Sequence, residues 1–182
     1  MLAIIGGTGL TQLANLEITH RQVIRTPYGE PSGALTIGKI KNEEVIFLAR
    51  HGYGHTIAPH DVNYRANMWA LQSRGVKDVV SVASVGGIHS DLTPGRIVIP
   101  DQIIDYTWGR KSTYRVGSDS PVLHMDFTEP YCEDMRQLCM RAAADCGESH
   151  VSSGVYACSQ GPRLETKAEI DRMERDGGAV GG

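Results

Sequence analysis

The sequence predicts an α/β fold built around a largely central sheet. Short apolar runs typical of buried strands alternate with segments whose apolar residues recur at helical spacing, and no internal repeat interrupts this alternation. Glycine is the third observation, since it occupies 21 of the 182 positions, well above its usual share of about 7%. Such an excess is typical of tight turns between strands and of close backbone approaches. The length is enough to bury a substantial core, and we expect a single domain over residues 1–182.

The first half of the chain supplies four predicted strands and one helix. Continuous apolar runs predict buried strands, and polar residues between two of them favour a hairpin. Gly75 stands where a glycine commonly ends a helix. In chain order, we expect strands over 1–5, 34–40 and 44–49, a helix over 62–75 and a strand over 76–85.

The second half repeats the alternation, and its cysteines have no metal-ligand spacing. We expect a strand over 96–100, a helix over 130–146, a strand over 154–159 and a helix over 165–175. Cys132, Cys139 and Cys146 are spaced by seven residues, which on a helix places them on roughly one stripe. Because free cysteine behaves as a small buried hydrophobe, we expect this stripe to face a core.

Charge and hydropathy exclude several classes of partner. Lys and Arg number 18 and Asp and Glu 21, a formal net charge of −3, which argues against binding to nucleic acid or to an anionic membrane surface. No apolar run approaches the roughly 20 residues of a membrane span, and no signal segment opens the chain. With no disulfide pattern either, we expect a cytoplasmic protein.

Glycines and polar residues follow three predicted strands and indicate an anion site. Ligands of open α/β sheets bind outside the carboxyl ends of strands, so these segments are expected to converge. Gly6-Gly7-Thr8-Gly9 exposes backbone N–H groups beside a hydroxyl. Arg50 follows a buried run, and its planar guanidinium suits a phosphate dianion. Ser84 and the backbone N–H groups beside it, which Gly86 and Gly87 follow in the chain, can supply further hydrogen bonds to a phosphate at this site.

Each of these segments also has a simpler interpretation. The glycine turn lacks the lysine of a phosphate-binding loop and the spacing of a dinucleotide fingerprint, so it can be a tight turn only. Arg50 can instead pair with Asp101 or Asp105 at the rim of the core. His51 and His55 resemble half of a metal site, but no close Cys or carboxylate completes it, and we expect no metal.

A fourth segment, residues 159–166, has the chemistry of a base-binding loop. Its Pro-fixed turn presents Leu164, which can pack on a planar heterocycle, beside Glu165, which can hydrogen-bond the edge of that ring. The alternative is the N-terminus of a helix, where Glu165 and Thr166 would favour the helix dipole.

These segments together resemble the purine nucleoside phosphorylase superfamily, in particular its methylthioadenosine phosphorylase branch. The resemblance runs through nearly the whole chain and is most specific from Arg50-His51-Gly52 to Asn63-Tyr64-Arg65-Ala66-Asn67. Further matches are Ile5 to Leu10, Pro94 to Ile99 and Gly161-Pro162-Arg163. Residues 103–107, 154–158 and 160–166 look most like the bacterial S-methyl-5′-thioinosine phosphorylases.

The resemblance implies a three-layer fold with a mixed central sheet flanked by helices, and an enzyme that performs phosphorolysis. Inorganic phosphate is then a co-substrate, and no cofactor is expected. Carried over by position, the phosphate contacts are Thr8, Arg50, His51, Ala83 and Ser84, of which Arg50 and His51 are also the expected catalytic residues. Ala83 would act only through its backbone.

Leu164 and Glu165 are the expected base-specificity residues. A carboxylate accepts the N1–H of a 6-oxopurine but matches adenine poorly, because adenine N1 is itself an acceptor. We therefore expect phosphorolysis of S-methyl-5′-thioinosine to hypoxanthine and S-methyl-5-thioribose 1-phosphate, in purine salvage. Methylthioadenosine phosphorylase or a general purine nucleoside phosphorylase is the alternative.

The resemblance also predicts assembly and a missing C-terminal part. Relatives of this kind are trimers, so we expect a homotrimer, with His55 and residues 106–110 as candidates for its interface. The family continues with a Gly-Met-Thr-Gly-Met-Pro-Glu-Ala-like run and a later Asn/Asp loop, which Gly178 to Gly182 do not begin. We expect the last strands and the leaving-group residues to lie outside these 182 positions.

Two other function classes stay open at this point. One is a non-catalytic anion- or nucleotide-binding module that keeps the phosphate cradle without the chemistry. The other is a dinucleotide-dependent oxidoreductase, which only the first glycine turn favours, since no acidic residue follows a second strand at the expected position.

Overall fold

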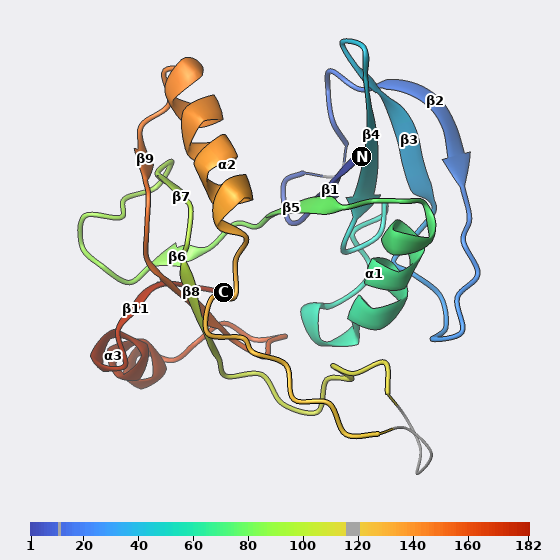
Figure 1. Ribbon diagram of the computed structural model, residues 1–182. Coiled ribbons are helices and arrows are strands. Elements are labelled where there is room, and N and C mark those ends of the chain that lie inside the picture. Colours follow the sequence, from blue (N-terminus) through green and yellow to red (C-terminus); the bar gives the residue numbers. More distant parts are fainter. Residues whose placement is uncertain (11, 116–120) are drawn as a thin grey trace. The chain divides into compact units, whose positions relative to one another are not determined.

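The computed structural model describes residues 1–10, 12–115 and 121–182, and its strands and helices alternate along the chain (Figure 1). This confirms the predicted α/β class. By their internal contacts the residues form two units, Met1–Ser84 with Gly109–Ser118, and Val85–Trp108 with Asp119–Gly182. The strands lie in a five-stranded, a four-stranded and a two-stranded sheet, a finer division than the largely central sheet that we expected.

The first unit is organised by a mixed sheet of order β2-β3-β4-β1-β5. Its strands are β1 (Leu2–Gly6), β2 (Glu17–Gln22), β3 (Leu35–Ile40), β4 (Glu43–Ala49) and β5 (Asp78–Val82). β1 runs parallel to both β4 and β5, whereas β3 and β4 form the predicted antiparallel hairpin. β2 was not predicted, because this edge strand is mostly exposed and polar and is formed by its ladder with β3.

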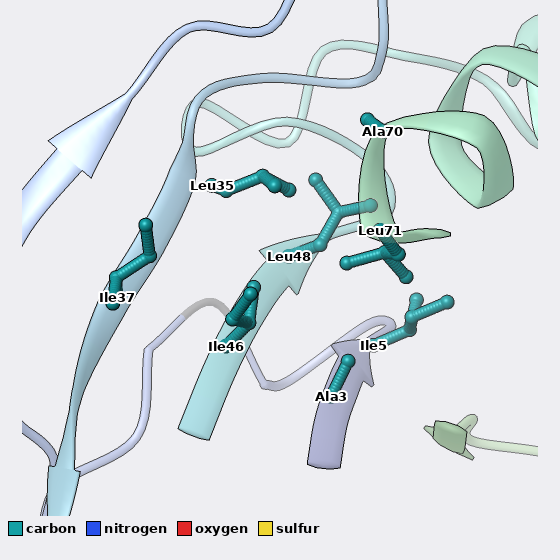
Figure 2. Close-up of a cluster of buried hydrophobic side chains, with 8 residues drawn as sticks. All are labelled: Ala3, Ile5, Leu35, Ile37, Ile46, Leu48, Ala70 and Leu71. Atoms are coloured by element: carbon teal, nitrogen blue, oxygen red, sulfur yellow. The ribbon is translucent and has the colours of Figure 1, made fainter. Parts of the chain in front are cut away.

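The core of the first unit covers both faces of this sheet. Along β4, Ile46 and Leu48 join one buried cluster, and Val45, Phe47 and Ala49 join another. Alternate residues of a strand point to opposite faces, so β4 is buried on both sides, as its unbroken apolar run predicts. The first cluster also receives Ala70 and Leu71 of the helix α1 (Tyr64–Ser73), which therefore packs on that face (Figure 2).

The start of α1 is set by Asn63. Its side-chain oxygen accepts a hydrogen bond from Ala66 N at 3.1 Å, while its amide nitrogen donates to Tyr28 O at 2.7 Å. The helix therefore begins two residues later than the apolar spacing predicts, after the short 3-10 turn η1 (Pro59–Asp61). Gly75, with a φ of 76°, stands just past its end as predicted.

The second unit holds a sheet of order β6-β11-β10-β8. Its strands are β6 (Gly86–Gly87), β8 (Gln102–Asp105), β10 (Val155–Cys158) and β11 (Gly178–Gly181), and a separate parallel pair is formed by β7 (Ile97–Val98) and β9 (His150–Val151). β10 lies parallel to β8 and β11. β8 was not predicted, since four residues with two central apolar side chains show too little pattern, and its pairing with β10 defines it.

Residues Gly178–Gly181 form the buried strand β11, which the sequence analysis did not predict. The helix α3 (Lys167–Arg175) packs on this strand. A Cβ at Gly178 would lie 3.0 Å from Met173 O and 3.3 Å from the Ala157 Cβ. Glycine is favoured there because a methyl group would meet the helix and strand at less than the ordinary contact distance.

The cysteine stripe is a second correction. In the helix α2 (Glu133–Asp145) no residue is buried, and Cys132 and Cys146 are exposed. Both cysteines are cap residues outside the regular helix, so seven-residue spacing does not place them on one helical face. α2 is instead tied to its unit by Arg136, whose Nε donates to Pro100 O at 3.0 Å and whose guanidinium also bonds Glu133 and Ser152 O.

Candidate functional site

Three strand ends meet at one edge of the first-unit sheet. Gly6, the last residue of β1, pairs in register with Ala49 of β4 and with Val82 of β5. Parallel strands end at the same edge, so the residues that follow these three strands are brought together. They are the sequence-predicted residues Thr8, Arg50, His51, Ala83 and Ser84.

The two glycines after β1 are required by close packing. A Cβ at Gly6 would lie 2.1 Å from Leu10 O. One at Gly7 would lie 2.6 Å from the Arg50 Nη2 and 2.8 Å from Val82 O. Gly7 is therefore wedged between the β5 backbone and the Arg50 guanidinium, which the absence of a side chain alone permits.

Arg50 presents a guanidinium that no carboxylate of the described first unit neutralises by an ion pair. The side chain is half-buried, and its Nη1 lies 3.5 Å from the Ser81 Oγ. The two aspartates considered as alternative partners accept backbone hydrogen bonds in the second unit: Asp101 from Gly154 N at 2.7 Å and Asp105 from Thr107 N at 2.8 Å. A planar cation held this way suits a phosphate. Ser81 was not singled out from the sequence.

His51 is buried and has a defined orientation. Its Nδ1 lies 2.8 Å from Ile57 O, and because a carbonyl only accepts, Nδ1 must carry the proton. Burial lowers the pKa of His51, and the positive charges of Arg50 and His55 lower it further, against the hydrogen bond to Ile57 O that raises it. The neutral ring then offers Nε2 as an acceptor.

Thr8 and Ser84 complete the group of Thr8, Arg50, His51, Ala83 and Ser84, which we call the first-unit cluster. The Ser84 hydroxyl donates to Thr8 O at 3.1 Å, which ties the segment after β5 to the glycine turn after β1. Both residues and Ala83 are exposed. Backbone N–H groups, hydroxyls and a guanidinium are thus gathered at one edge, the donor set that an oxyanion requires.

The described residues hold no group of three or more His, Cys, Asp or Glu side chains able to bind a metal ion. His51 and His55 lie with ring centroids 5.0 Å apart.

No helix in the described ranges is both long and apolar enough to cross a membrane.

A separate pocket of about 500 Å³ lies in the second unit, at the carboxyl ends of β8 and β10. Cys158 and Asp105 are paired at the ends of these parallel strands, so the segments that follow both strands line it. The lining residues are Asp105, Tyr106, Thr107, Trp108, Ser159, Gln160, Gly161, Arg163, Glu165, Glu169, Arg172 and Met173.

Of the two expected base-specificity residues, Glu165 lines this pocket. It lies before α3, whose N-cap is Thr166, and its Oε1 accepts a hydrogen bond from the Ser159 hydroxyl. Leu164 is 86% exposed and is not among the lining residues. The helix-start interpretation of this segment therefore applies to Thr166, and Glu165 remains available to the pocket.

Several pocket residues were not identified from the sequence as binding groups. The Tyr106 hydroxyl donates to the Asp176 Oδ2 at 2.7 Å, and this hydrogen bond raises the pKa of Tyr106. Trp108 is 73% exposed, and its backbone N donates to the Gln160 Oε1 at 3.2 Å. The signal that could have found them is their position directly after β8, a strand too short to be predicted.

Comparisons with known proteins agree on one family. The Phosphorylase superfamily profile matches residues 1–182. A "Probable S-methyl-5′-thioinosine phosphorylase" of Pseudomonas syringae pv. tomato is 50% identical over 96% of this chain and 71% of its own length. The "6-oxopurine nucleoside phosphorylase" of Pyrococcus furiosus is 44% identical over 100% of this chain and 69% of its own length.

A solved structure shares the fold as well. Methylthioadenosine phosphorylase from Schistosoma mansoni in complex with adenine superimposes with a TM-score of 0.94 at 31% identity, over 100% of this chain and 72% of that chain. The chain thus spans about 70% of the length of these relatives.

Proposed function

The chain belongs to the Phosphorylase superfamily, and from that premise we propose that it catalyses the reversible phosphorolysis of S-methyl-5′-thioinosine. The products are hypoxanthine and S-methyl-5-thioribose 1-phosphate, as expected for an enzyme of purine salvage. The observation that carries the proposal is the convergence of Thr8, Arg50, His51 and Ser84 at the edge where β1, β4 and β5 end.

Phosphate binding is assigned to the first-unit cluster. The Arg50 guanidinium supplies the charge, and Thr8 and backbone N–H groups after β1 and β5, including that of Ala83, supply neutral donors. The Ser84 hydroxyl becomes a further donor when it turns from Thr8 O to the ion. His51 keeps Nδ1–H on Ile57 O, so its Nε2 accepts the hydroxyl hydrogen of a monohydrogen phosphate. The protein thereby distinguishes the phosphate oxygens and fixes the ion in one orientation.

The reaction forms a bond from a phosphate oxygen to the anomeric carbon and breaks the bond from that carbon to the purine nitrogen. The electron pair of the broken bond leaves with the base. Positive charge develops on the sugar ring before the new bond is complete, and an oriented anion next to that carbon stabilises it. Positioning and electrostatics therefore supply most of the expected rate enhancement.

Base selection is assigned to Glu165 in the second-unit pocket, which Leu164 does not line. A 6-oxopurine presents N1–H to a carboxylate, whereas adenine presents a lone pair at that position. The mismatch leaves two acceptors facing each other, which disfavours adenine more strongly than a change of shape would.

A second candidate is general phosphorolysis of 6-oxopurine nucleosides, which the 44% identity to the Pyrococcus furiosus relative favours. Comparing kcat/KM for inosine with that for S-methyl-5′-thioinosine separates the two. Equal values would favour the general enzyme, and a clear preference for methylthioadenosine would contradict the assignment of Glu165.

The proposal is tested by phosphate-dependent release of hypoxanthine, coupled to xanthine oxidase. Arg50→Met is expected to lower kcat/KM by about 10²–10³-fold, the usual effect of removing a donor aimed at transition-state charge. Arg74→Met, an exposed arginine of the first unit just past α1, is the matched control and should leave the rate unchanged. Binding of phosphate or nucleoside without turnover would support the non-catalytic module instead.

We also propose, from the resemblance to trimeric relatives, that the protein is a cytoplasmic homotrimer of single phosphorylase domains, with His55 and residues 106–110 at the interface. Sedimentation equilibrium at micromolar concentration tests the assembly. A monomer at all concentrations would contradict it.

A further inference from the structure

Glu165 is held by a residue with no assigned part in base recognition. Ser159 is the first residue after β10, and its hydroxyl donates to the Glu165 Oε1. Both side chains line the same pocket. Within the second unit, the Glu165 Oε2 makes no hydrogen bond to a described residue, so one carboxylate oxygen is occupied and the other is left as an acceptor.

The backbone on both sides of Glu165 is held independently by Glu169. Its carboxylate accepts hydrogen bonds from the Arg163 Nη1 at 2.9 Å and Nη2 at 2.8 Å, and from Thr166 N at 2.7 Å. The Thr166 hydroxyl in turn accepts from Glu169 N at 3.2 Å, which completes a capping box. The Arg163 Nη1 also donates to Leu164 O at 3.0 Å.

The capping box and the Ser159 hydroxyl restrict different parts of Glu165. The capping box orders the loop and with it the Glu165 backbone, but it does not contact the Glu165 side chain. With the backbone fixed, the Glu165 side chain could still adopt several rotamers, and its carboxylate could occupy different positions in a pocket of about 500 Å³. The Ser159 hydroxyl is the contact that removes this freedom.

We infer that Ser159 is a positioning residue for base recognition: its hydroxyl occupies the Glu165 Oε1 so that Oε2 is presented to the N1–H of a 6-oxopurine. The inference rests on the proposed function and names a specificity determinant for it. Serine is suited to this part because a hydroxyl can donate to the carboxylate, whereas the side chain of alanine or valine cannot.

Loss of the hydroxyl should act on selectivity more than on folding. Without Ser159 as donor, Oε1 becomes a second free acceptor, water competes for both oxygens, and the carboxylate is no longer preorganised. We expect the advantage of hypoxanthine over adenine to fall by about tenfold in Ser159→Ala, the effect of one hydrogen bond to a charged group. Ser159→Thr keeps the hydroxyl and should restore the wild-type ratio.

The experiment measures two quantities on each purified protein. Calorimetry gives the Kd of hypoxanthine and of adenine in the presence of phosphate. Chromatographic measurement of the released base gives kcat/KM for methylthioinosine and methylthioadenosine. Ser153→Ala, an exposed serine of the same unit outside the pocket, is the matched control. Thermal unfolding of all variants reports any general loss of stability.

The inference is supported if the hypoxanthine-to-adenine ratio falls in Ser159→Ala alone, with Ser159→Thr and Ser153→Ala at the wild-type ratio. It is overturned if both bases weaken equally, as a merely structural role would produce, if the ratio does not change, or if wild-type protein binds neither base. Failure of the proposed function has a different signature, namely no phosphate-dependent turnover by wild-type protein, and in that case the base-binding ratio still decides the role of Ser159.

Discussion

Gly7 is the position where the smallest covalent change should disturb the proposed phosphate site most. In Gly7→Ala the new methyl group would lie 2.6 Å from the Arg50 Nη2 and 2.8 Å from Val82 O, whereas ordinary contacts begin at 3.4 Å. The carbonyl belongs to the β5 backbone and yields little, so the guanidinium must retreat by about 0.8 Å if it takes up the clash by itself. Overpacking of this kind costs about 1–3 kcal/mol of stability.

The functional consequence follows from the displacement of Arg50. A misplacement of roughly 1 Å at a catalytic group can cost about 10²-fold in rate, so we expect kcat/KM for phosphate to fall by about that factor. The coupled hypoxanthine assay at varied phosphate measures it, and thermal unfolding measures the stability. Gly33→Ala is the control, because its Cβ would meet Tyr53 at an ordinary 3.5 Å.

Two results would refute this reasoning. If folded Gly7→Ala keeps the wild-type KM for phosphate and the wild-type kcat, the guanidinium beside Gly7 does not contact phosphate. If Gly7→Ala does not fold, Arg50→Lys serves instead: it keeps the charge but loses the planar fork, and unchanged phosphate kinetics would contradict a bidentate role.

Three further predictions concern titration and packing. Because burial lowers the pKa of His51 in the folded state, the unfolded chain binds more protons below about pH 6.5, so the free energy of unfolding of the wild type should fall as pH drops through this range. In His51→Asn, which can still donate to Ile57 O, urea titrations from about pH 5 to 8 should show that this dependence on pH is lost. An unchanged dependence would contradict the prediction. Leu48→Ala removes a side chain with no exposed surface and should cost about 2–5 kcal/mol in the free energy of unfolding, against no measurable cost for Leu164→Ala, which is 86% exposed; similar costs would contradict the burial pattern. Hydrogen bonds from Arg163 and Thr166 N lower the pKa of Glu169 to about 2, so the carbon-detected NMR shift of its carboxylate should stay constant down to about pH 3. The stability that the capping box contributes should be complete above about pH 4.5 and be lost as pH falls from there through the folded-state pKa. A titration midpoint near 4.5 would show that the capping box is not formed.

Much of the first unit could be predicted from sequence because its patterns are strong. The run over 45–49 is apolar throughout, and this part of β4 is buried on both faces as that pattern requires. The helix after it has regular spacing and a glycine at its end, and its two boundaries differ from the prediction by two residues each. Thr8, Arg50 and Ser84 were identified from their residue types near predicted strand ends, whereas His51 and Ala83 were assigned to phosphate binding by the resemblance alone.

The second unit was harder to predict because its strands are short. β6, β7 and β9 have two residues each, and β8 has four, so none shows a measurable alternation. The cysteine stripe was wrong for a related reason: seven-residue spacing describes a helical face only if all members lie within the helix, and Cys132 and Cys146 are its caps.

The residue types of both proposed sites were thus determined by the sequence: a guanidinium and hydroxyls near strand ends, and a carboxylate after a proline turn. Tertiary structure decided which of these groups have partners. Parallel pairing of β1 with β4 and β5 brings Gly7 against Arg50, and the end of β10 brings Ser159 to Glu165. Part of the glycine excess has the same explanation, since Gly6 and Gly7 stand where another backbone or side chain passes too close for a methyl group. Other glycines, such as Gly9, Gly75 and Gly95, have open space around them and are used for their positive φ. Such distances depend on strand register and helix packing between segments far apart in the chain, which local patterns of residues do not encode.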